Sequence, residues 1–256
     1  LVVGGKAEAV DGGGYSCDKS NIAGGYTIFP AFSVLSRSMS RLSLVITPDQ
    51  FLDVMLHENK IYVGGSTKLY VYNQQDSSVG TYNAGTFIYA LAGDGNTLAV
   101  SLGSEIRFLD AATLTARSYK TPVGATVLKF DGGKLYAVGR YLFVIDPETG
   151  SITGKVNLNN VPTYGIAVIG NTVYCASGSY FFVVDVSNPA DPKILSFTRP
   201  QLVTHPYARI FGVGVITGGR LAVSLTNGGL GVLDVIDPMK PRLIWNAFGA
   251  GNSRDL

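Results

Sequence analysis

Charge, sulfur and long apolar runs are all scarce in this 256-residue chain. Charged residues make up 15% of it, well below the roughly 25% of an ordinary soluble domain. Lys and Arg total 20 against 18 Asp and Glu, and neither sign is clustered. Because nucleic acid binding needs a basic stripe that displaces counterions from phosphates, we expect no nucleic acid partner. With no run of about 18 apolar residues, we also expect no membrane span in this sequence.

Cysteines and catalytic motifs are scarce too. Cys17 and Cys175 are the only cysteines, too few and too far apart for a metal cluster. Cys175 lies in a strand-like apolar run, so it is either a packed free thiol or the disulfide partner of Cys17. There is no His-Glu-x-x-His, no Cys-x-x-Cys-His, no phosphate loop and no Gly-x-Ser-x-Gly. We therefore expect no metal, no cofactor and no catalysis.

Apolar and neutral polar residues make up the share of the composition that charged residues usually have. The hydrophobic fraction is 46%, enough for a large core, and the chain has 32 Gly and 14 Tyr. This balance favours a secreted or surface-exposed protein over a cytosolic enzyme. The sequence begins with Leu1 rather than Met, which a removed signal peptide would explain, as would trimming. We expect an extracellular, cell-surface location.

One pattern repeats along the chain. It has an apolar run, a tight turn rich in Gly, Ser or Asn, a second apolar run and then usually Asp. Successive copies start 37, 37, 38 and 48 residues apart. The copies are "KIYVGGSTKLYVYN" (60–73), "TLAVSLGSEIRFLD" (97–110), "KLYAVGRYLFVID" (134–146), "TVYCASGSYFFVVD" (172–185) and "RLAVSLTNGGLGVLD" (220–234).

Turns every 8 to 12 residues between β-branched and aromatic runs predict short antiparallel strands, four in each repeat. For the copy at 134–146 we place them at about 125–130, 134–139, 141–146 and 151–157. Four-stranded units of about 40 residues are typical of β-propeller blades. No useful 3.6-residue period appears, so helices should be nearly absent. The predicted fold class is an all-β propeller of four-stranded antiparallel blades.

Six blades are favoured. Five lie between about residues 51 and 248, and a sixth is predicted in "AFSVLSRSMSRLSLVITPDQ" (31–50). Seven stay an alternative, because residues 1–25 contain the strand-like "LVVGGKAEAV". We divide the chain into a Gly-rich N-terminal arm or ring-closing strand at 1–25 and a propeller domain at 26–256.

Asp and Pro recur where the third strand of a repeat ends. An Asp side chain accepts a hydrogen bond from the N–H two residues on, and Pro fixes φ in the turn that follows. A second Pro stands at the start of the outermost strand, where it hinders pairing of this edge strand with another chain. We therefore predict a structural turn role for Asp110, Asp146, Asp185, Pro189, Pro192, Asp234, Pro238 and Pro241.

Two stretches carry a family resemblance. "VVDVSNPADPKIL" (183–195) and "GVLDVIDPMKPRLI" (231–244) resemble the LVIVP-type repeat of bacterial and archaeal surface proteins. "YLFVIDPETGSITGKV" (141–156) is similar to strands of YVTN-type surface-layer propellers. Both resemblances imply a β-propeller that is commonly extracellular, and neither brings catalytic residues with it.

The insertion "RPQLVTHPYAR" (199–209) lengthens the last repeat spacing to 48 residues. Of the two histidines, His57 is expected in a solvated turn and His205 lies in this insertion. The face that carries the insertion suits a glycan or a peptide, through aromatic stacking and planar hydrogen bonds, although the insertion could merely cap the channel. The candidate face comprises Arg140, Tyr141, Asn160, Tyr164, Arg199, His205, Tyr207, Arg209 and Asn227.

Three functions follow, in order of preference. The first is a non-catalytic structural or assembly module of a surface layer or filament. In it the N-terminal arm either completes a blade of its own chain or pairs with a neighbour. The second is a propeller that binds a glycan or peptide through the face of the 199–208 insertion. The third is a propeller hydrolase or lyase, which the uncharged inner strands "YGIAVIG" (164–170) and "FGVGVITG" (211–218) disfavour.

Overall fold

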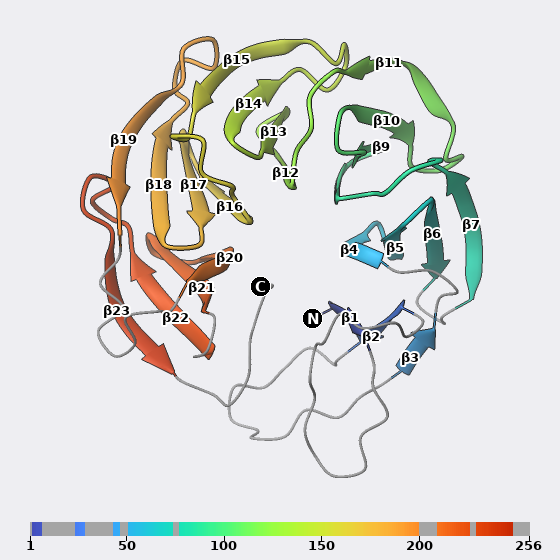
Figure 1. Ribbon diagram of the computed structural model, residues 1–256, viewed down its shortest axis with the longest axis horizontal. Coiled ribbons are helices and arrows are strands. Elements are labelled where there is room, and N and C mark those ends of the chain that lie inside the picture. Colours follow the sequence, from blue (N-terminus) through green and yellow to red (C-terminus); the bar gives the residue numbers. More distant parts are fainter. Residues whose placement is uncertain are drawn as a thin grey trace. The chain divides into compact units, whose positions relative to one another are not determined.

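The computed structural model describes residues 2–6, 24–28, 43–46, 51–73, 77–199, 209–225 and 229–247. Within these ranges every regular element is a β-strand, and no helix occurs (Figure 1). The chain forms two compact units, Leu1–Val123 and Gly124–Leu256. Each unit is built from three antiparallel sheets, and we call each sheet a blade.

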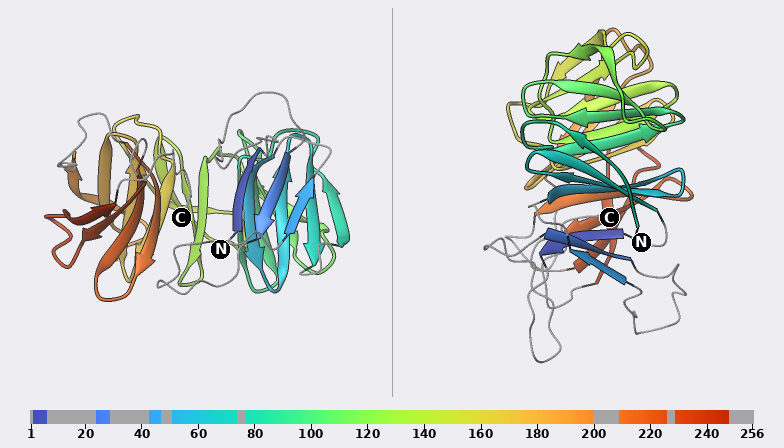
Figure 2. Two further views of the ribbon diagram at one scale, coloured as in Figure 1. Left: turned by 90° about the horizontal axis from the view of Figure 1, so that it is seen from below. Right: turned by 90° about the vertical axis from the view of Figure 1, so that its right-hand side faces the viewer.

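The first unit contains one three-stranded and two four-stranded blades, each with its strands in sequential order. First strands of successive blades lie side by side, β1 beside β4 and β4 beside β8 (Figure 2). The strands are β1 (Val2–Lys6), β2 (Gly24–Ile28), β3 (Ser43–Ile46), β4 (Phe51–His57), β5 (Lys60–Gly65), β6 (Lys68–Asn73), β7 (Ser78–Asn83), β8 (Ala90–Asp94), β9 (Thr97–Ser101), β10 (Ile106–Asp110) and β11 (Ala116–Thr121).

The second unit contains three four-stranded blades, again in sequential order, with β12 beside β16 and β16 beside β20. The strands of blade β12–β15 lie within two residues of the predicted positions. The strands are β12 (Val127–Asp131), β13 (Lys134–Val138), β14 (Tyr141–Ile145), β15 (Ile152–Asn157), β16 (Gly165–Ile169), β17 (Thr172–Ser177), β18 (Tyr180–Asp185), β19 (Lys193–Thr198), β20 (Ile210–Ile216), β21 (Arg220–Leu225), β22 (Gly229–Asp234) and β23 (Arg242–Ala247).

The core of the second unit lies between neighbouring blades. Tyr174, Phe181 and Val183 of blade β16–β19 pack against Leu221 and Val223 of blade β20–β23. The opposite face of blade β16–β19 packs on blade β12–β15, so the second and third strands of this middle blade are buried on both sides. Each such buried side chain stabilises the fold by roughly 1.5–3 kcal/mol relative to an exposed one. This two-sided burial explains why these strands are continuous apolar runs rather than alternating ones.

An Asp at the end of the third strand, or directly after it, makes the same local contact in four blades. Oδ1 of Asp110, Asp146, Asp185 and Asp234 accepts a hydrogen bond from the backbone N–H two residues on, at 2.8–3.1 Å. These backbone hydrogen bonds are the main reason that the pKa of Asp146, Asp185 and Asp234 lies below its ordinary value, whereas the pKa of Asp110 is lowered mainly by the backbone N–H of Thr113, three residues on. The Asp therefore shapes the turn into the fourth strand.

The proline turn of blade β16–β19 also makes a contact between blades. A Cβ atom at Gly154, in the fourth strand β15 of the preceding blade, would overlap the carbonyl oxygen of Pro189 and touch Cδ of Pro192. The turn thus rests directly on the backbone of β15, and only glycine permits this approach. The two prolines stiffen a contact surface as well as a turn.

The six blades agree with the favoured blade count, although the first of them has three strands among the described residues. Val2–Lys6 of the predicted arm forms β1, which pairs antiparallel with β2 of its own chain, and β2 pairs with β3. Ser43–Ile46 lies in the segment predicted as the sixth blade. The rest of 1–25 and of 31–50 lies outside the described residues.

Candidate functional site

Every blade of the second unit has two chemically different ends. At one end, which we call the turn end, lie the links between first and second strands and between third and fourth strands. At the other, the loop end, lie the links between second and third strands and the connections to the next blade. The described candidates of the predicted face all lie at the loop end: Arg140, Tyr141, Asn160, Tyr164, Arg199 and Arg209. The remaining three, His205, Tyr207 and Asn227, fall outside the described residues.

The connection from β15 to β16 is tied to the loop before β14. The N–H groups of Leu158 and Thr163 donate to the carbonyl oxygens of Arg140 and Gly139, at 3.0 and 3.2 Å. Between these bonds the N–H of Asn160 donates to Oδ1 of Asn157, and Asn160 has a positive φ of 56°. Asparagine tolerates this left-handed conformation better than most residues. The connection is therefore fixed by its own backbone bonds.

A chain of hydroxyl groups lies beneath the residue that precedes β16. The Thr126 hydroxyl donates to the carbonyl oxygen of Thr163 at 2.5 Å, and the buried Thr163 and Ser177 hydroxyls are 2.7 Å apart. The N–H of Tyr164 donates to the carbonyl oxygen of Ala176 at 2.8 Å. Together these bonds set the position of the Tyr164 backbone at the loop end.

Two aromatic rings meet where the first strands β16 and β20 approach one another. The rings of Tyr164 and Phe211 have centroids 4.9 Å apart, and Tyr164 is 44% exposed. The approach depends on Gly165, because a Cβ atom there would lie 2.5 Å from the carbonyl oxygen of Phe211. Gly165, next to Tyr164, thus allows the two rings to come into contact. Sequence analysis predicted this pair only in part, because it named Tyr164 alone.

A second aromatic cluster lies at the loop end of blade β16–β19. The rings of Tyr180 and Phe197 stack with centroids 4.8 Å apart and planes 25° apart, and Phe197 also contacts the buried Phe182 at 4.6 Å. Tyr180 is 36% and Phe197 43% exposed. Sequence analysis missed Tyr180, Phe197 and Phe211. Aligning strand pairs between repeats would have found Tyr180 and Phe197, since both stand at positions that are charged in blade β8–β11.

Three arginine residues lie at the same loop end as these rings. The Arg209 side chain lies against Gly178, in the tight link between β17 and β18, where Gly178 and Ile210 exchange backbone hydrogen bonds of 2.9 and 2.7 Å. Arg199 follows the last residue of β19, and Arg140 precedes β14; both are exposed. Tyr141 differs, because its ring packs on Phe143 and is half-buried.

The acidic residues of the second unit lie at the opposite end. In the described part of this unit none occupies a position at the loop end. Each ends a first or third strand or lies in a turn that follows a third strand. They are Asp131, Asp146, Glu148, Asp185, Asp191, Asp234 and Asp237. Among its described residues, the loop end of the second unit therefore combines exposed aromatic rings with arginine and contains no acidic residue, and we call it the arginine–aromatic face.

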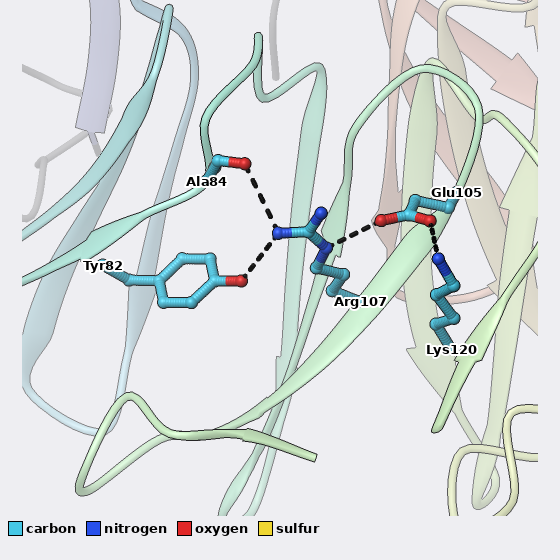
Figure 3. A network of polar contacts seen from close by, with 5 residues as sticks. All are labelled: Tyr82, Ala84, Glu105, Arg107 and Lys120. Carbon is cyan, nitrogen blue, oxygen red and sulfur yellow. Dashed lines mark hydrogen bonds and ion pairs between the residues drawn. The ribbon is translucent and has the colours of Figure 1, made fainter. Parts of the chain in front are cut away.

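At the loop end of the first unit, charged side chains pair with one another (Figure 3). Arg107 Nε donates to Glu105 Oε1 at 2.7 Å, and Arg107 Nη1 donates to the Tyr82 hydroxyl at 3.0 Å and to the Ala84 carbonyl at 3.4 Å. Lys120 Nζ donates to Glu105 Oε2 at 2.5 Å. Hydrogen bonds from Lys120 and Arg107 hold the pKa of Glu105 below its ordinary value. This network joins blades β4–β7 and β8–β11.

Two other polar residues of the first unit have structural partners. Asp53 is an acidic residue in a first strand that sequence analysis overlooked. Its Oδ2 accepts from the N–H of Leu91 at 2.6 Å, and its Oδ1 accepts from the N–H of Val54. His57, expected in solvent, instead lies at the end of β4 with Nε2 2.7 Å from the carbonyl oxygen of Gly95. Its ring packs over Gly93, which has no Cβ to block it.

The remaining candidates for reactive groups are the cysteines and the residues that could hold a metal ion. Cys175 is a free thiol buried in the core, and burial raises its pKa. This agrees with the packed thiol among the two alternatives and not with a disulfide, although Cys17 itself lies outside the described residues. Among the described residues, no three His, Cys, Asp or Glu side chains are grouped to hold a metal ion. Nor does any helix in that part of the chain have the length and apolar character to cross a membrane.

Comparison with known proteins identifies the repeat and the fold. The family model described as the LVIVD repeat matches residues 163–197, which include the first of the two stretches that carry the resemblance. No curated protein sequence is significantly similar to the chain.

Solved structures similar to this chain include three propeller-type proteins. The Neurospora crassa Pan2 WD40 domain is 11% identical, with a TM-score of 0.67 over 91% of this chain and 75% of that one. A chain of the mitotic checkpoint complex is 11% identical, with a TM-score of 0.71 over 91% and 76%. BamB from Moraxella catarrhalis is 16% identical, with a TM-score of 0.59 over 81% and 66%. At such identities the likeness concerns the fold alone: the chain is a β-propeller with an LVIVD repeat.

Proposed function

We propose that this chain is a non-catalytic propeller that binds a partner through the loop end of its second unit. The arginine–aromatic face carries the proposal. Exposed aromatic rings and arginine are the residue types enriched where binding energy concentrates in protein interfaces. Backbone bonds hold the connection from Leu158 to Thr163 beside Tyr164, so binding there would cost little ordering entropy.

The absence of catalysis is part of the same proposal. A hydrolase would need acidic or histidine side chains that converge on one point. Asp53, an acidic residue in the middle of the first strand β4, already accepts hydrogen bonds from the N–H groups of Val54 and Leu91. The similar WD40 and BamB structures are compatible with a binding scaffold. One of the similar chains belongs to a multi-protein complex, which supports a protein partner here.

A cell-surface location belongs to the proposal as well. It is supported by the low charged fraction of 15% and by the resemblance of residues 183–195 and 231–244 to the LVIVP-type repeat of surface proteins. Protease added to intact cells should degrade this protein while sparing a cytosolic marker. Protection of the protein until the cells are lysed would contradict the location.

A screen with short peptides and glycans tests the binding function. The purified full chain is screened against a display library of short peptides and against a glycan array. Ligands of the wild type should lose at least about tenfold in affinity for the Tyr164→Ala, Phe211→Ala variant. The matched control is Phe87→Ala, Tyr89→Ala, which removes an exposed aromatic pair from the first unit. Absence of any ligand, or equal losses in both variants, would refute the proposal.

The second candidate is a structural subunit of a surface layer or filament, and the fourth strand β23 favours it. Ile244 and Trp245 of β23 are exposed, Trp245 by 53%, and no described strand pairs with its outer edge. Exposed apolar edge strands without a central charge are prone to pair with other chains. Electron microscopy of the concentrated protein should then show polymers that Trp245→Lys abolishes. Monomers at every concentration would exclude this role.

A further inference from the structure

We propose that the arginine–aromatic face binds an acidic peptide segment, one whose carboxylates alternate with apolar or aromatic side chains. The inference rests on the proposed function and names the chemistry of its ligand. It is carried by the separation of charge within the second unit and by the exposed ring pairs at the positively charged end.

Charge separation selects the sign of the ligand. Arg140, Arg199 and Arg209 lie at the loop end, and Lys155 of β15 is exposed close to that end. Every acidic residue in the described part of this unit is at the turn end, about one strand length away. Glu105 shows by contrast what an acidic residue does at a loop end, since in the first unit it engages both Arg107 and Lys120. A ligand carboxylate would supply a negatively charged partner for the exposed Arg140 and Arg199.

Arginine favours carboxylate over a neutral ligand. Its planar guanidinium can donate two parallel hydrogen bonds to one carboxylate, and such charge-assisted bonds are about twice as strong as neutral ones. A carboxylate here meets no like charge among the described residues of the loop end. The electrostatic attraction would raise the association rate and weaken as salt is added.

The rings select a peptide over a glycan. Tyr164 with Phe211, and Tyr180 with Phe197, are paired at centroid distances of 4.9 and 4.8 Å. In the stacked pair of Tyr180 and Phe197, one face of each ring is covered by the other, whereas sugars bind by stacking on free ring faces. The paired rings form an apolar surface on which leucine or tyrosine side chains can pack edge-on or offset. The face thus matches a segment that carries both charge and apolar side chains.

Two synthetic peptides of equal size test the charge requirement. One has the sequence Asp-Leu-Asp-Tyr-Asp-Leu and the other Asn-Leu-Asn-Tyr-Asn-Leu, both with blocked ends. Affinities for the full chain are measured by calorimetry at low and high salt. The acidic peptide should bind at least about tenfold more tightly, and added salt should narrow the gap. The acidic polysaccharide polygalacturonate serves as the third probe.

Matched charge variants locate the binding. The Arg140→Gln, Arg199→Gln variant should lose at least about tenfold in affinity for the acidic peptide and nothing for the neutral one. Arg242→Gln removes the same charge at the turn end, where Arg242 pairs with Asp234, and should bind like wild type. Circular dichroism confirms that each variant is folded.

The outcomes separate this inference from the proposed function. Equal binding of both peptides, with loss in the Tyr164→Ala, Phe211→Ala variant, keeps the binding function and overturns the acidic preference. Binding of polygalacturonate alone overturns the peptide in favour of an acidic glycan. If neither peptide binds while the screened ligands lack acidic groups, the inference fails. If the screen yields no ligand, the proposed function fails with it.

Discussion

Blades β8–β11 and β16–β19 place different side chains at the same three positions of the repeat. Both sets lie at the start of the third strand and on the fourth strand opposite it. In the first unit they form an ion-pair network, and in the second an aromatic cluster. In register order the positions are Glu105, Arg107 and Lys120 in one blade and Tyr180, Phe182 and Phe197 in the other.

The same positions of the repeat thus hold residues that stabilise the fold in the first unit and residues that we propose to bind a partner in the second. The charges of the first unit satisfy one another, and the side chains of Glu105 and Arg107 are only 16% and 32% exposed. The outer rings of the second unit stack but keep more than a third of their surface in solvent. An exposed apolar cluster gains little for folding, so its presence at a position where the repeat accepts charge supports the proposed binding of a partner.

The two units also differ in how a turn docks on the preceding blade. Gly154 lies against the backbone of Pro189, whereas a Cβ atom at Gly80 would meet the flexible end of Leu114 at 2.9 Å. Gly154→Ala should therefore lower the free energy of unfolding by about 3 kcal/mol, and Gly80→Ala by less than about 1 kcal/mol. Urea titration measures both. Equal losses would show that the proline turn moves as easily as a leucine side chain.

Replacing one arginine in each unit contrasts their loop ends directly. Arg107→Gln breaks the bonds to Glu105, Tyr82 and Ala84 and should cost about 1–2 kcal/mol of unfolding free energy. The matched Arg140→Gln should change it by less than about 0.5 kcal/mol, because Arg140 is exposed. Thermal and urea unfolding give both values. A larger loss for Arg140→Gln would mean that the second unit also uses its arginine for folding.

The pH dependence of the network gives the smallest effect. The pKa of Glu105 is lowered by Lys120 and Arg107, so its ionised form stabilises the folded state. That contribution is complete above the ordinary glutamate pKa of about 4.3 and is lost as pH falls from there through the lower folded-state pKa. The stability gap between wild type and Glu105→Gln should shrink between pH 7 and pH 3. A constant gap would assign the network no electrostatic role.

Local chemistry made much of the fold predictable. Each Asp-containing turn is fixed by a bond to the N–H two residues on, as at Asp185 and Ser187, and needs no distant partner. The strands around residue 140 were found because apolar runs and glycine turns alternate within one hairpin. The link between Gly154 and Pro189 could not be found in this way, since it joins residues of different blades.

Contacts across strands explain why the site was found only in part. Tyr164 was named because it lies in a connection between strands, where binding residues are expected. Tyr180 and Phe197 are distant in the sequence and meet only through strand pairing. The partnership of Arg107 with Tyr82 depends on the packing of two blades.

Side-chain NMR of the aromatic residues tests the central claim most directly. The acidic peptide is added to the full chain, and the aromatic carbon–proton resonances are followed. Those of Tyr164, Tyr180, Phe197 and Phe211 should shift together with one affinity, while Phe87 and Tyr89 of the first unit stay unchanged. Shifts confined to Phe87 and Tyr89, or no shift at any of the four, would contradict a binding face at the loop end of the second unit.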